Sequence, residues 1–545
     1  MIFLSTLLIS ILIPIALIPV FGSLALRLQL VDLPNERKVH SQPIPRIGGI
    51  AIAIGAFIPI VLWCREGSFV SSYLPAALVI VAFGVVDDLR ELSARWKLSG
   101  QFAAALIVVF LGELKITHLG GLLPDGYLLP DGIAIPLTLL VIVGVTNAIN
   151  LSDGLDGLAG GICLLFFSCI GYLAYLEGDT VLGLVALALF GAVFGFLRFN
   201  THPASVFMGD TGSQLLGFSA ITLALDLTQG NTPLSPVLPL ILLGFPVLDT
   251  LTVMTVRIAQ GRSPFSADRN HFHHNLMKLG LHHNESVLVI YVIQMLLILV
   301  AYRFRFYSDW LLLSGYLVFS AGIIALFIAP TRTAWRPQRS ALLIQIKLTM
   351  KRMQNKRWVI RGIFRSLHFG LPLLLAFTLL LPKVIPHYIN VAFLVFSALI
   401  FYCMYYKKTW LGDLLRLTLY LVIPFAVYQA DTAPADFMAG MGFPFHNVLI
   451  GIFAVFNILV SRLSRRRKGF RSTPLDFLVL FLAVVVPNLP DQNLQAYHLG
   501  LVAAKVVILY YSCEVLLAEL RGKYDRFAWG IVTVLAGVGC WGVMR

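Results

Sequence analysis

Long apolar runs recur along the whole chain and dominate its pattern. Each is close to the roughly 17–25 residues that cross a hydrocarbon core of about 30 Å as a helix. Lipid cannot satisfy backbone polar groups, so a spanning run must form its hydrogen bonds within itself. The pattern therefore predicts an all-α polytopic membrane protein with about eleven spans in its first part and about seven more after them. The first spans are expected at 3–26, 47–63, 72–86, 99–112, 133–149, 158–176, 180–197, 212–227, 235–256, 285–301 and 310–330, and the others at 367–381, 389–406, 410–429, 442–460, 474–489, 497–519 and 527–543.

Basic residues in the short loops orient the chain and divide it. An excess of Lys and Arg marks the cytoplasmic loops of a membrane protein. With the N-terminus outside, the basic segment 331–365 and the basic cluster at 462–471 both fall on the cytoplasmic side. Arg303 and Arg305 oppose the bias, which is a sum and is not overturned by two residues. We predict a first membrane domain at 1–330, a basic cytoplasmic linker at 331–365 and a further membrane domain at 366–545.

The composition narrows the classes of function. A share of 58% hydrophobic against 12% charged residues is not the balance of a soluble protein. The net charge of +14 is spread over loops between apolar runs, which indicates topology and contact with anionic lipid, not with nucleic acid. The six cysteines are scattered without a CxxC pair, so neither a disulfide framework nor a zinc site is expected. The first run has no basic residue before it and no small-residue cleavage signal, and we expect it to remain as a span.

Polar and acidic residues gather in four motifs, and all four fall on the predicted cytoplasmic side. Such residues at the ends of spans are costly to keep without a use. Taken singly, each motif has a structural explanation: a helix cap for the Asp pair or for MGDTG, a tight turn for the Asp-Gly repeat, and a basic loop for the His run. Their convergence on one side favours a functional site. The motifs are GVVDDLRELSARWKLSGQ at 84–101, TNAINLSDGLDGLAGG at 146–161, FNTHPASVFMGDTGS at 199–213 and SPFSADRNHFHHN at 263–275.

The chemistry of these motifs points to a metal ion and phosphate. Several carboxylates and an amide oxygen at a membrane surface suit Mg²⁺, which proteins hold through one or two carboxylates together with substrate phosphates. Lys97, Arg269 and the His run add positive charge and hydrogen-bond donors for a diphosphate. We therefore predict Mg²⁺-dependent phosphoryl chemistry, with Mn²⁺ as the alternative ion.

In family order and at similar spacing, the motifs resemble the polyprenyl-phosphate N-acetylhexosamine-1-phosphate transferase family. The resemblance covers residues 1–330 and includes a fifth motif, ERKVHSQPIPRIGG, at 36–49. It implies a bacterial inner-membrane enzyme with a cytoplasmic active site. Its expected reaction moves N-acetylhexosamine 1-phosphate, with N-acetylglucosamine as the expected sugar, from a UDP-sugar to undecaprenyl phosphate and releases UMP. Such a reaction starts the synthesis of a lipid-linked surface polysaccharide or O-antigen.

The resemblance also assigns roles to single residues. Those that match active-site acids are Asp87, at the reacting lipid phosphate, with Asp88, Asp153 and Asp156. Those that match magnesium ligands are Asn150 and Asp210. Those that match substrate-binding residues are Lys97 for phosphate, Asn200 and Phe207 for the uracil, and Arg269, His271, His273 and His274 for the diphosphate or sugar. The fifth motif contributes Lys38, His40 and Arg46 without assigned roles.

Two departures from the family pattern set the alternatives. Residues 271–275 read HFHHN, where the branch that uses UDP-MurNAc-pentapeptide usually has three His followed by Phe-Glu, which favours the N-acetylhexosamine branch. The family usually ends near the eleventh span, so the role of 366–545 stays open. The alternatives are the peptidoglycan transferase, a transporter or flippase, whose sites usually lie near the bilayer midplane, and an inactive regulatory member. The sequence leaves open direct attack against an Asp-bound intermediate, and it leaves open a homodimer.

Overall fold

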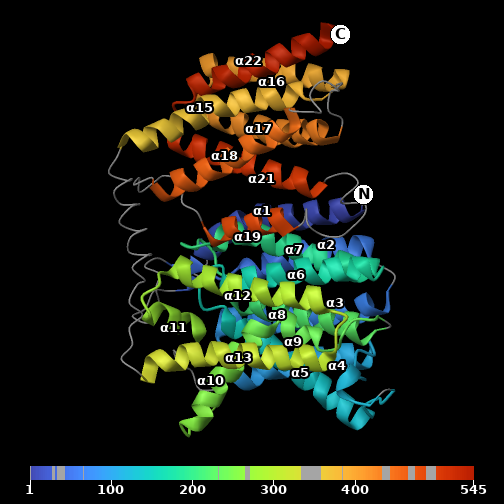
Figure 1. Ribbon diagram of the computed structural model, residues 1–545. Coiled ribbons are helices and arrows are strands. Elements are labelled where there is room, and N and C mark those ends of the chain that lie inside the picture. Colours follow the sequence, from blue (N-terminus) through green and yellow to red (C-terminus); the bar gives the residue numbers. More distant parts are fainter. Residues whose placement is uncertain are drawn as a thin grey trace. The chain divides into compact units, whose positions relative to one another are not determined.

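The structure divides the chain into two compact units, Met1–Pro337 and Gln338–Arg545, and the boundary falls inside the predicted linker. Both units are built from helices (Figure 1). The computed structural model describes residues 2–27, 31–32, 43–64, 67–124, 126–230, 232–263, 271–332, 357–382, 385–432, 442–463, 473–485 and 499–544.

In the first unit every expected span coincides with a helix or a pair of helices, which confirms the all-α membrane fold. Two short strands, β1 (Val31–Asp32) and β2 (Ile44–Pro45), pair antiparallel beside the helices. The helices are α1 (Ile2–Arg27), α2 (Gly48–Trp63), α3 (Ser68–Arg90), α4 (Ala94–Phe110), α5 (Asp131–Ser152), α6 (Leu158–Leu176), α7 (Thr180–Asn200), α8 (Gly209–Gln229), α9 (Leu238–Leu242), α10 (Gly244–Ala259), α11 (Phe272–Lys278), α12 (His283–Phe304) and α13 (Asp309–Arg332).

The expected span 235–256 is broken between α9 and α10, and proline explains the break. Pro246 has no N–H, so it cannot bond to the carbonyl of Leu242 four residues earlier. The side chain of Gln294 in α12 supplies the missing donor, with its Nε2 2.6 Å from Leu242 O. The hydroxyl of Tyr316 in α13 donates to Gly244 O, at 2.8 Å. A buried polar side chain of a neighbouring helix thus satisfies the carbonyl of Leu242 that the break exposes.

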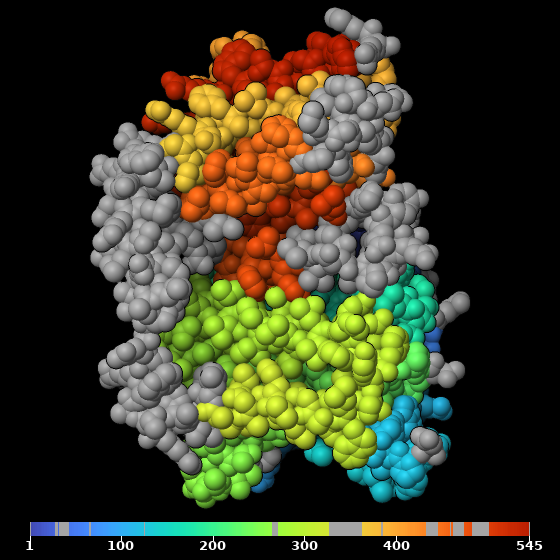
Figure 2. All heavy atoms as spheres, viewed as in Figure 1, coloured from blue at the N-terminus to red at the C-terminus, as the bar shows by residue number. Residues whose placement is uncertain are grey.

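The surface of the helices is that of a membrane protein. Eleven described helices are long and apolar enough to cross a membrane, and three shorter apolar helices accompany them. Large apolar side chains of α12 and α13, among them Leu296, Leu317 and Val318, are more than half exposed. Figure 2 shows the side chains of these two helices covering one face of the first unit. Exposed apolar surface of this kind is suited to lipid, and the protein is a multi-pass membrane protein.

Close helix packing fixes the beginning of α8 against α2 and α3. A Cβ on Gly49 of α2 would lie 2.2 Å from the backbone nitrogen of Gly212. A Cβ on Gly84 of α3 would lie 2.5 Å from Cα of Thr211. Small residues let membrane helices approach this closely. Because Asp210 precedes these contacts by one or two residues, its position is set by backbone packing.

In the second unit every expected span again coincides with a helix. One boundary differs: α13 ends at Arg332 and α15 begins at Arg357, so the predicted linker 331–365 is helical at both ends, and residues 333–356 lie outside the described part. The helices are α15 (Arg357–Leu380), α16 (His387–Tyr406), α17 (Lys408–Thr432), α18 (Gly442–Leu463), α19 (Pro474–Val485), α21 (Leu499–Leu520) and α22 (Asp525–Met544).

Two acids of the second unit, Glu514 and Asp431, are paired with side chains of neighbouring helices. Glu514 accepts hydrogen bonds from Arg416 Nε at 3.1 Å and from the Tyr420 hydroxyl at 2.7 Å. Lys505 Nζ lies 2.6 Å and 2.8 Å from the two carboxylate oxygens of Asp431, and both side chains are buried. These pairs join α17 to α21. Paired charges inside a membrane unit hold helices together, so their presence alone does not mark a catalytic site.

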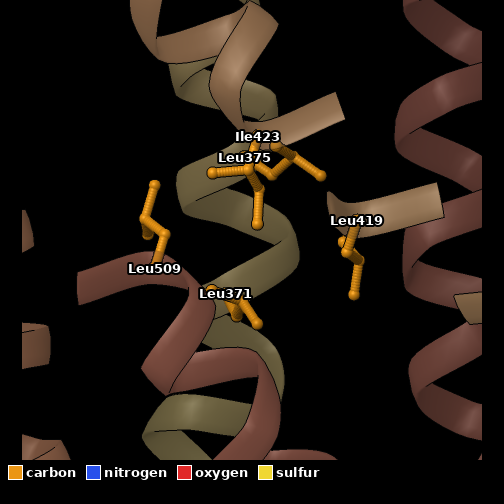
Figure 3. Close-up of a pocket in the computed structure, with 5 residues that line it drawn as sticks. All are labelled: Leu371, Leu375, Leu419, Ile423 and Leu509. Carbon is orange, nitrogen blue, oxygen red and sulfur yellow. The ribbon is translucent and has the colours of Figure 1, made fainter. Parts of the chain in front are cut away.

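A small cavity in the second unit is apolar throughout. The side chains of Figure 3 come from α15, α17 and α21. Because these side chains carry only carbon, the cavity offers no hydrogen bond to a phosphate or a sugar, and it is no candidate for a nucleotide-sugar site. The lining residues are Leu371, Leu375, Leu419, Ile423 and Leu509.

Candidate active site

The polar motifs of the first unit meet where one set of helix ends comes together. Helices α3, α5 and α7 end there, and α4, α8 and α12 begin there. Side chains of three motifs are in direct contact at this place: Lys97 from the first motif, Asn150 from the second and Asp210 from the third. The alternation of spans predicted this convergence, and the structure shows it.

Asp87 and Lys97 form an ion pair at the end of α3. Asp87 is 2% exposed, and its Oδ2 lies 2.5 Å from Lys97 Nζ. Its other oxygen, Oδ1, accepts a hydrogen bond from the backbone N–H of Leu92 at 2.7 Å. Lys97 Nζ also lies 3.4 Å from Asp210 Oδ2. One ammonium group therefore balances two carboxylates, which leaves this pair of acids with a net negative charge.

Asp210 lies in the first turn of α8 and contacts the end of α5. Its Oδ1 accepts a hydrogen bond from Asn150 Nδ2 at 2.8 Å, and both side chains are half-buried. Asn150 uses its amide nitrogen in this contact, so its amide oxygen is not engaged by Asp210. A carboxylate and an amide this close together are within reach of one shared ion.

Asp88 caps α8 from a different helix. Its Oδ1 accepts a hydrogen bond from Asp210 N at 2.8 Å, and its Oδ2 accepts from Thr211 N at 3.0 Å and from Thr211 Oγ1 at 2.6 Å. Helix N-termini carry unpaired N–H groups that acidic side chains satisfy. Gly209 makes the approach possible, since its φ is +71° and a Cβ there would lie 2.5 Å from the Asp88 carboxylate. These contacts position the beginning of α8, and the catalytic role that the sequence predicts for Asp88 stays a prediction.

Behind these residues, three amide side chains, two of them buried, join α4, α5 and α8. Gln101 Nε2 donates to Gln214 Oε1 at 3.0 Å, and Asn147 Nδ2 donates to Gln101 Oε1 at 2.5 Å. Gln101 and Gln214 are each 1% exposed. A buried amide network of this kind is costly to distort, because a broken bond leaves an unpaired polar group. The network therefore stabilises the arrangement of the three helices that carry Lys97, Asn150 and Asp210.

Asp153 and Asp156 lie in the loop between α5 and α6, in different surroundings. Burial, and then the negative charges of Asp210, Asp156 and Asp88, raise the pKa of Asp153 to about 7. Burial alone would also raise the pKa of Asp156, but hydrogen bonds from His202 and the Ala204 amide outweigh it and hold that pKa below its usual range. Two acids of one motif are thus pushed toward different protonation states.

His202 and His283 hold Asp156 in place. Asp156 Oδ2 lies 2.7 Å from His202 Nδ1 and accepts a hydrogen bond from Ala204 N at 3.1 Å. The backbone N–H of Asp156 donates to His283 Nε2 at 3.1 Å, and the two His rings stack with centroids 4.1 Å apart. One possible metal-ligand atom from each of the three side chains lies within 4.8 Å of the others, as in a metal site. However, His202 Nδ1 and His283 Nε2 already have hydrogen-bond partners in Asp156. The three side chains therefore hold the loop between α5 and α6 in place.

Asn200 and Phe207, predicted to contact uracil, differ in how they are placed. Asn200 is 2% exposed; its Oδ1 accepts from Gly157 N at 2.9 Å and its Nδ2 donates to Val206 O at 2.9 Å. Both ends of the amide are engaged by backbone, so Asn200 links the segment before Phe207 to Gly157, and its predicted contact with uracil stays a prediction. Phe207 is half-buried, and its backbone N and O pair with Pro45 O at 2.9 Å and Gly48 N at 3.0 Å. The fifth sequence motif therefore holds the segment that carries Phe207.

The His-rich motif reaches the site through α11. The ring of His273 lies over Gly154, where a Cβ would be 2.4 Å from His273 Nε2. Burial, followed by the nearby His274, lowers the pKa of His273 to about 3, so this ring is neutral. His271 Nδ1 lies 2.9 Å from the carboxylate of Asp249 in α10. Arg269, together with Lys38 and His40 of the fifth motif, lies outside the described residues.

Comparison with known proteins identifies the family. Residues 70–228 match the sequence family described as Glycosyl transferase family 4. A relative from Bacillus subtilis (strain 168), named "Probable undecaprenyl-phosphate N-acetylglucosaminyl 1-phosphate transferase", is 38% identical over 309 residues, which are 56% of this chain and 85% of the relative. The chain belongs to glycosyl transferase family 4. Two relatives named "Undecaprenyl-phosphate alpha-N-acetylglucosaminyl 1-phosphate transferase" support this: one from Escherichia coli (strain K12), 32% identical over 58% of this chain and 90% of its own, and one from Yersinia pestis, 30% identical over 61% and 92%.

The family 4 match lies within the first unit and includes most of the contacts described above. Residues 70–228 contain Asp87, Lys97, Asn150 and Asp210. The relatives align with 56% to 61% of this chain and with at least 85% of their own length. Nearly the full length of each relative thus aligns with little more than half of this chain. The first unit, Met1–Pro337, makes up a similar share of the chain.

The residues at this family 4 site fit a divalent cation. Asp210 and Asn150 present a carboxylate and an amide 2.8 Å apart, and oxygen ligands of these two kinds suit Mg²⁺. Burial comes first among the causes that raise the pKa of Asp153, and the negative charges of Asp210, Asp156 and Asp88 that follow it are charges that a cation would offset. The ligand pair would form when the Asn150 amide turns its oxygen toward the ion.

Several residues of the site escaped sequence reasoning, and some carried a signal. Asp249 is an acid inside an apolar span, and such residues usually have a use. Gln101 and Gln214 are polar residues on membrane helices and carried the same signal more weakly. His202 lies in the third motif, but nothing in the sequence indicated its contact with His283, because the two lie far apart in the sequence and meet only through the fold.

Proposed function

We propose that this protein transfers N-acetylglucosamine 1-phosphate from UDP-N-acetylglucosamine to undecaprenyl phosphate on the cytoplasmic face of the bacterial inner membrane. In the reaction an oxygen of the lipid phosphate forms a bond with the β-phosphorus of the nucleotide sugar. The bond from that phosphorus to the bridging oxygen breaks, and UMP leaves with the oxygen. The lipid-linked product would then start a surface polysaccharide.

The contact of Asp87, Lys97, Asp210 and Asn150 at one set of helix ends carries this proposal. It places acids, an ammonium and an amide at the edge of the membrane helices, where a lipid phosphate and a water-soluble nucleotide can meet. The names of the relatives, which act on undecaprenyl phosphate, support the same lipid acceptor. A transporter would carry its acids near the bilayer midplane instead.

Each residue has a proposed task. Asp210 and Asn150 hold Mg²⁺, which when bound stabilises the charge that develops on the leaving phosphate oxygens. Lys97 contacts the phosphates and offsets their charge. Asp87 receives the remaining proton of the lipid phosphate, since it is the acid beside Lys97 that no helix N-terminus engages. The half-buried ring of Phe207 stacks on the uracil.

A direct assay separates this function from that of the peptidoglycan transferase. Membranes that contain the full-length protein are incubated with Mg²⁺, undecaprenyl phosphate and either labelled UDP-N-acetylglucosamine or labelled UDP-MurNAc-pentapeptide. We expect lipid-soluble label and UMP from the first donor and background levels from the second. Label from the pentapeptide donor alone would replace the proposal by the peptidoglycan function, and no label from either would refute both.

Phe207→Ala is expected to raise KM for UDP-N-acetylglucosamine about 5- to 150-fold and to leave KM for the lipid unchanged. The range corresponds to the roughly 1–3 kcal/mol that stacking of a base on an aromatic side chain contributes. Steady-state kinetics with each substrate varied in turn measures both constants, and Phe207→Tyr, which keeps the ring, is the matched control. An unchanged nucleotide KM in Phe207→Ala would remove the uracil from this ring.

Residues 1–337 alone are expected to retain the transfer reaction. The described contacts of the site lie within Met1–Pro337, and a chain that ends at Pro337 stops before α15 begins at Arg357. A cut after Arg365 would instead leave the first turns of α15 without the rest of the helix. Activity per amount of inserted protein is compared with the full chain. A stable, inserted fragment without activity would show that the second unit is part of the catalytic unit.

A further inference from the structure

Asp249 lies within α10, which forms most of the expected span 235–256, and its side chain holds the beginning of α11. The side chain is 5% exposed. Its Oδ2 lies 2.9 Å from His271 Nδ1, and its Oδ1 accepts a hydrogen bond from the backbone N–H of Phe272 at 2.8 Å. A carboxylate can only accept, so the His271 ring donates from Nδ1. Both oxygens of one acid thus hold two consecutive residues.

An aromatic contact one turn away supports the same junction. The rings of Phe245 in α10 and Phe272 in α11 meet edge to face, with centroids 5.0 Å apart. Residues 245 and 249 are four apart, so they share a face of α10. An apolar contact and two hydrogen bonds from this face therefore fix how α11 begins, while α12 packs against its other side (Figure 1).

The junction determines where the His-rich motif points. When both ring nitrogens of His271 carry a proton, Nδ1–H donates to Asp249 and Nε2–H remains to donate to a ligand oxygen. The rings of His271 and His273 stack with centroids 5.8 Å apart, and His273 lies over Gly154, in the loop that carries Asp153 and Asp156. A displacement of His271 would therefore be transmitted through His273 to the loop that carries Asp153 and Asp156. The arrangement parallels that of Asp88, which holds the beginning of α8 from α3.

We propose that Asp249 is a positioning residue that presents His271 Nε2 to the β-phosphate of the UDP-sugar through its bonds to His271 and Phe272. The proposal rests on the proposed function, because it takes the nucleotide diphosphate as the ligand. It adds a residue in a membrane helix to a site that otherwise consists of helix ends and loops. UDP, which has the β-phosphate, and UMP, which lacks it, are the two probes that separate this task from general stability.

The test measures binding of UDP and of UMP to the purified full-length protein by calorimetry, in the same Mg²⁺ buffer. Asp249→Asn keeps an oxygen for Phe272 N–H but presents an amide N–H₂ to His271, which can no longer donate to it. We expect Kd for UDP to rise about tenfold, the low end of what loss of a supporting hydrogen bond causes at a site, and Kd for UMP to change less than twofold. Asp179→Asn is the matched control: Asp179 also caps a helix, accepting from Leu182 N at 2.9 Å, but at the opposite end of α7.

A double-variant cycle shows whether Asp249 acts through His271. In a His271→Ala background, Asp249→Asn should add no further loss of UDP binding, because its partner is already gone. Equal losses for UDP and UMP, or full additivity of the two substitutions, would overturn the proposal. If Asp249→Asn fails to fold, His271→Ala alone must still weaken the binding of UDP more than the binding of UMP. Equal weakening of the binding of both nucleotides would also overturn the proposal. These measurements need no turnover, so a failure of the proposed reaction is recognised separately, in the wild-type transfer assay.

Discussion

Asp210→Asn is expected to lower kcat for sugar-phosphate transfer by about 10²–10³-fold or more while the protein still inserts in the membrane. A loss of this size accompanies removal of a single preorganised electrostatic group from an active site. Asp210 contacts Asn150 at 2.8 Å and Lys97 at 3.4 Å, so its carboxylate is the charge shared by the proposed cation site and the phosphate-binding lysine. The amide keeps the shape and removes the charge. Initial rates at saturating substrates and several Mg²⁺ concentrations measure the effect.

The same helix supplies the control for this substitution. Asp226 lies in α8 sixteen residues after Asp210, near the other end of the helix, and Asp226→Asn should leave kcat within about twofold because charges this far apart are largely screened. Both variants are compared with the wild type in the amount of protein inserted in the membrane and in the elution of the detergent-solubilised protein. A near-wild-type rate for Asp210→Asn at low Mg²⁺ would show that Asp210 is not a metal ligand.

Asp87→Asn is expected to lower kcat by about 10²–10⁴-fold with little change in KM for the nucleotide, the range typical of losing an acid or base that transfers a proton. Asp87 is buried, and its Oδ2 lies 2.5 Å from Lys97 Nζ, beside the proposed position of the lipid phosphate. Asn retains an oxygen for the Leu92 N–H and keeps the local turn. The rate is measured as a function of lipid and nucleotide concentration separately.

Asp88→Asn separates the two neighbouring acids. Asp88 holds the first turn of α8 through three hydrogen bonds. In Asp88→Asn an amide N–H₂ faces those donors, so both the thermal stability of the protein and its affinity for Mg²⁺ should fall. For Asp87→Asn the melting temperature should stay close to that of the wild type. If both variants lose stability equally and keep equal activity, the division of tasks between these two acids is wrong.

The membrane fold could be predicted from the sequence because lipid leaves a spanning segment few choices. Every span expected from apolar length coincides with a helix or a pair of helices, and the departures from that expectation have local causes. The break between α9 and α10 depends on Pro246, whose consequence is visible only once Gln294 of another helix is seen to bond Leu242 O. α11 forms in a segment too short and too polar to be predicted as a helix, and it depends on a cap from Asp249.

The sequence predicted which motifs form the site, but it did not predict what each residue of those motifs contacts. Convergence followed from counting spans, since each span reverses the side of the next loop. Asp88 and Asn200 were assigned to chemistry and to uracil, whereas their polar atoms are engaged in holding α8 and the segment before Phe207. Such engagement depends on the backbone that faces a side chain. The sequence does not contain that information in its local pattern.

The path of the β-phosphorus tests the central claim most directly. Full-length protein in membranes is given undecaprenyl phosphate, Mg²⁺ and UDP-N-acetylglucosamine with a radioactive phosphorus at either the α or the β position. Because the bond between the β-phosphorus and the bridging oxygen is the one that breaks, the account predicts β-label in the lipid and α-label in UMP. If the lipid gains N-acetylglucosamine while both the α-label and the β-label stay in water-soluble UDP, the protein transfers the sugar alone and the account is contradicted.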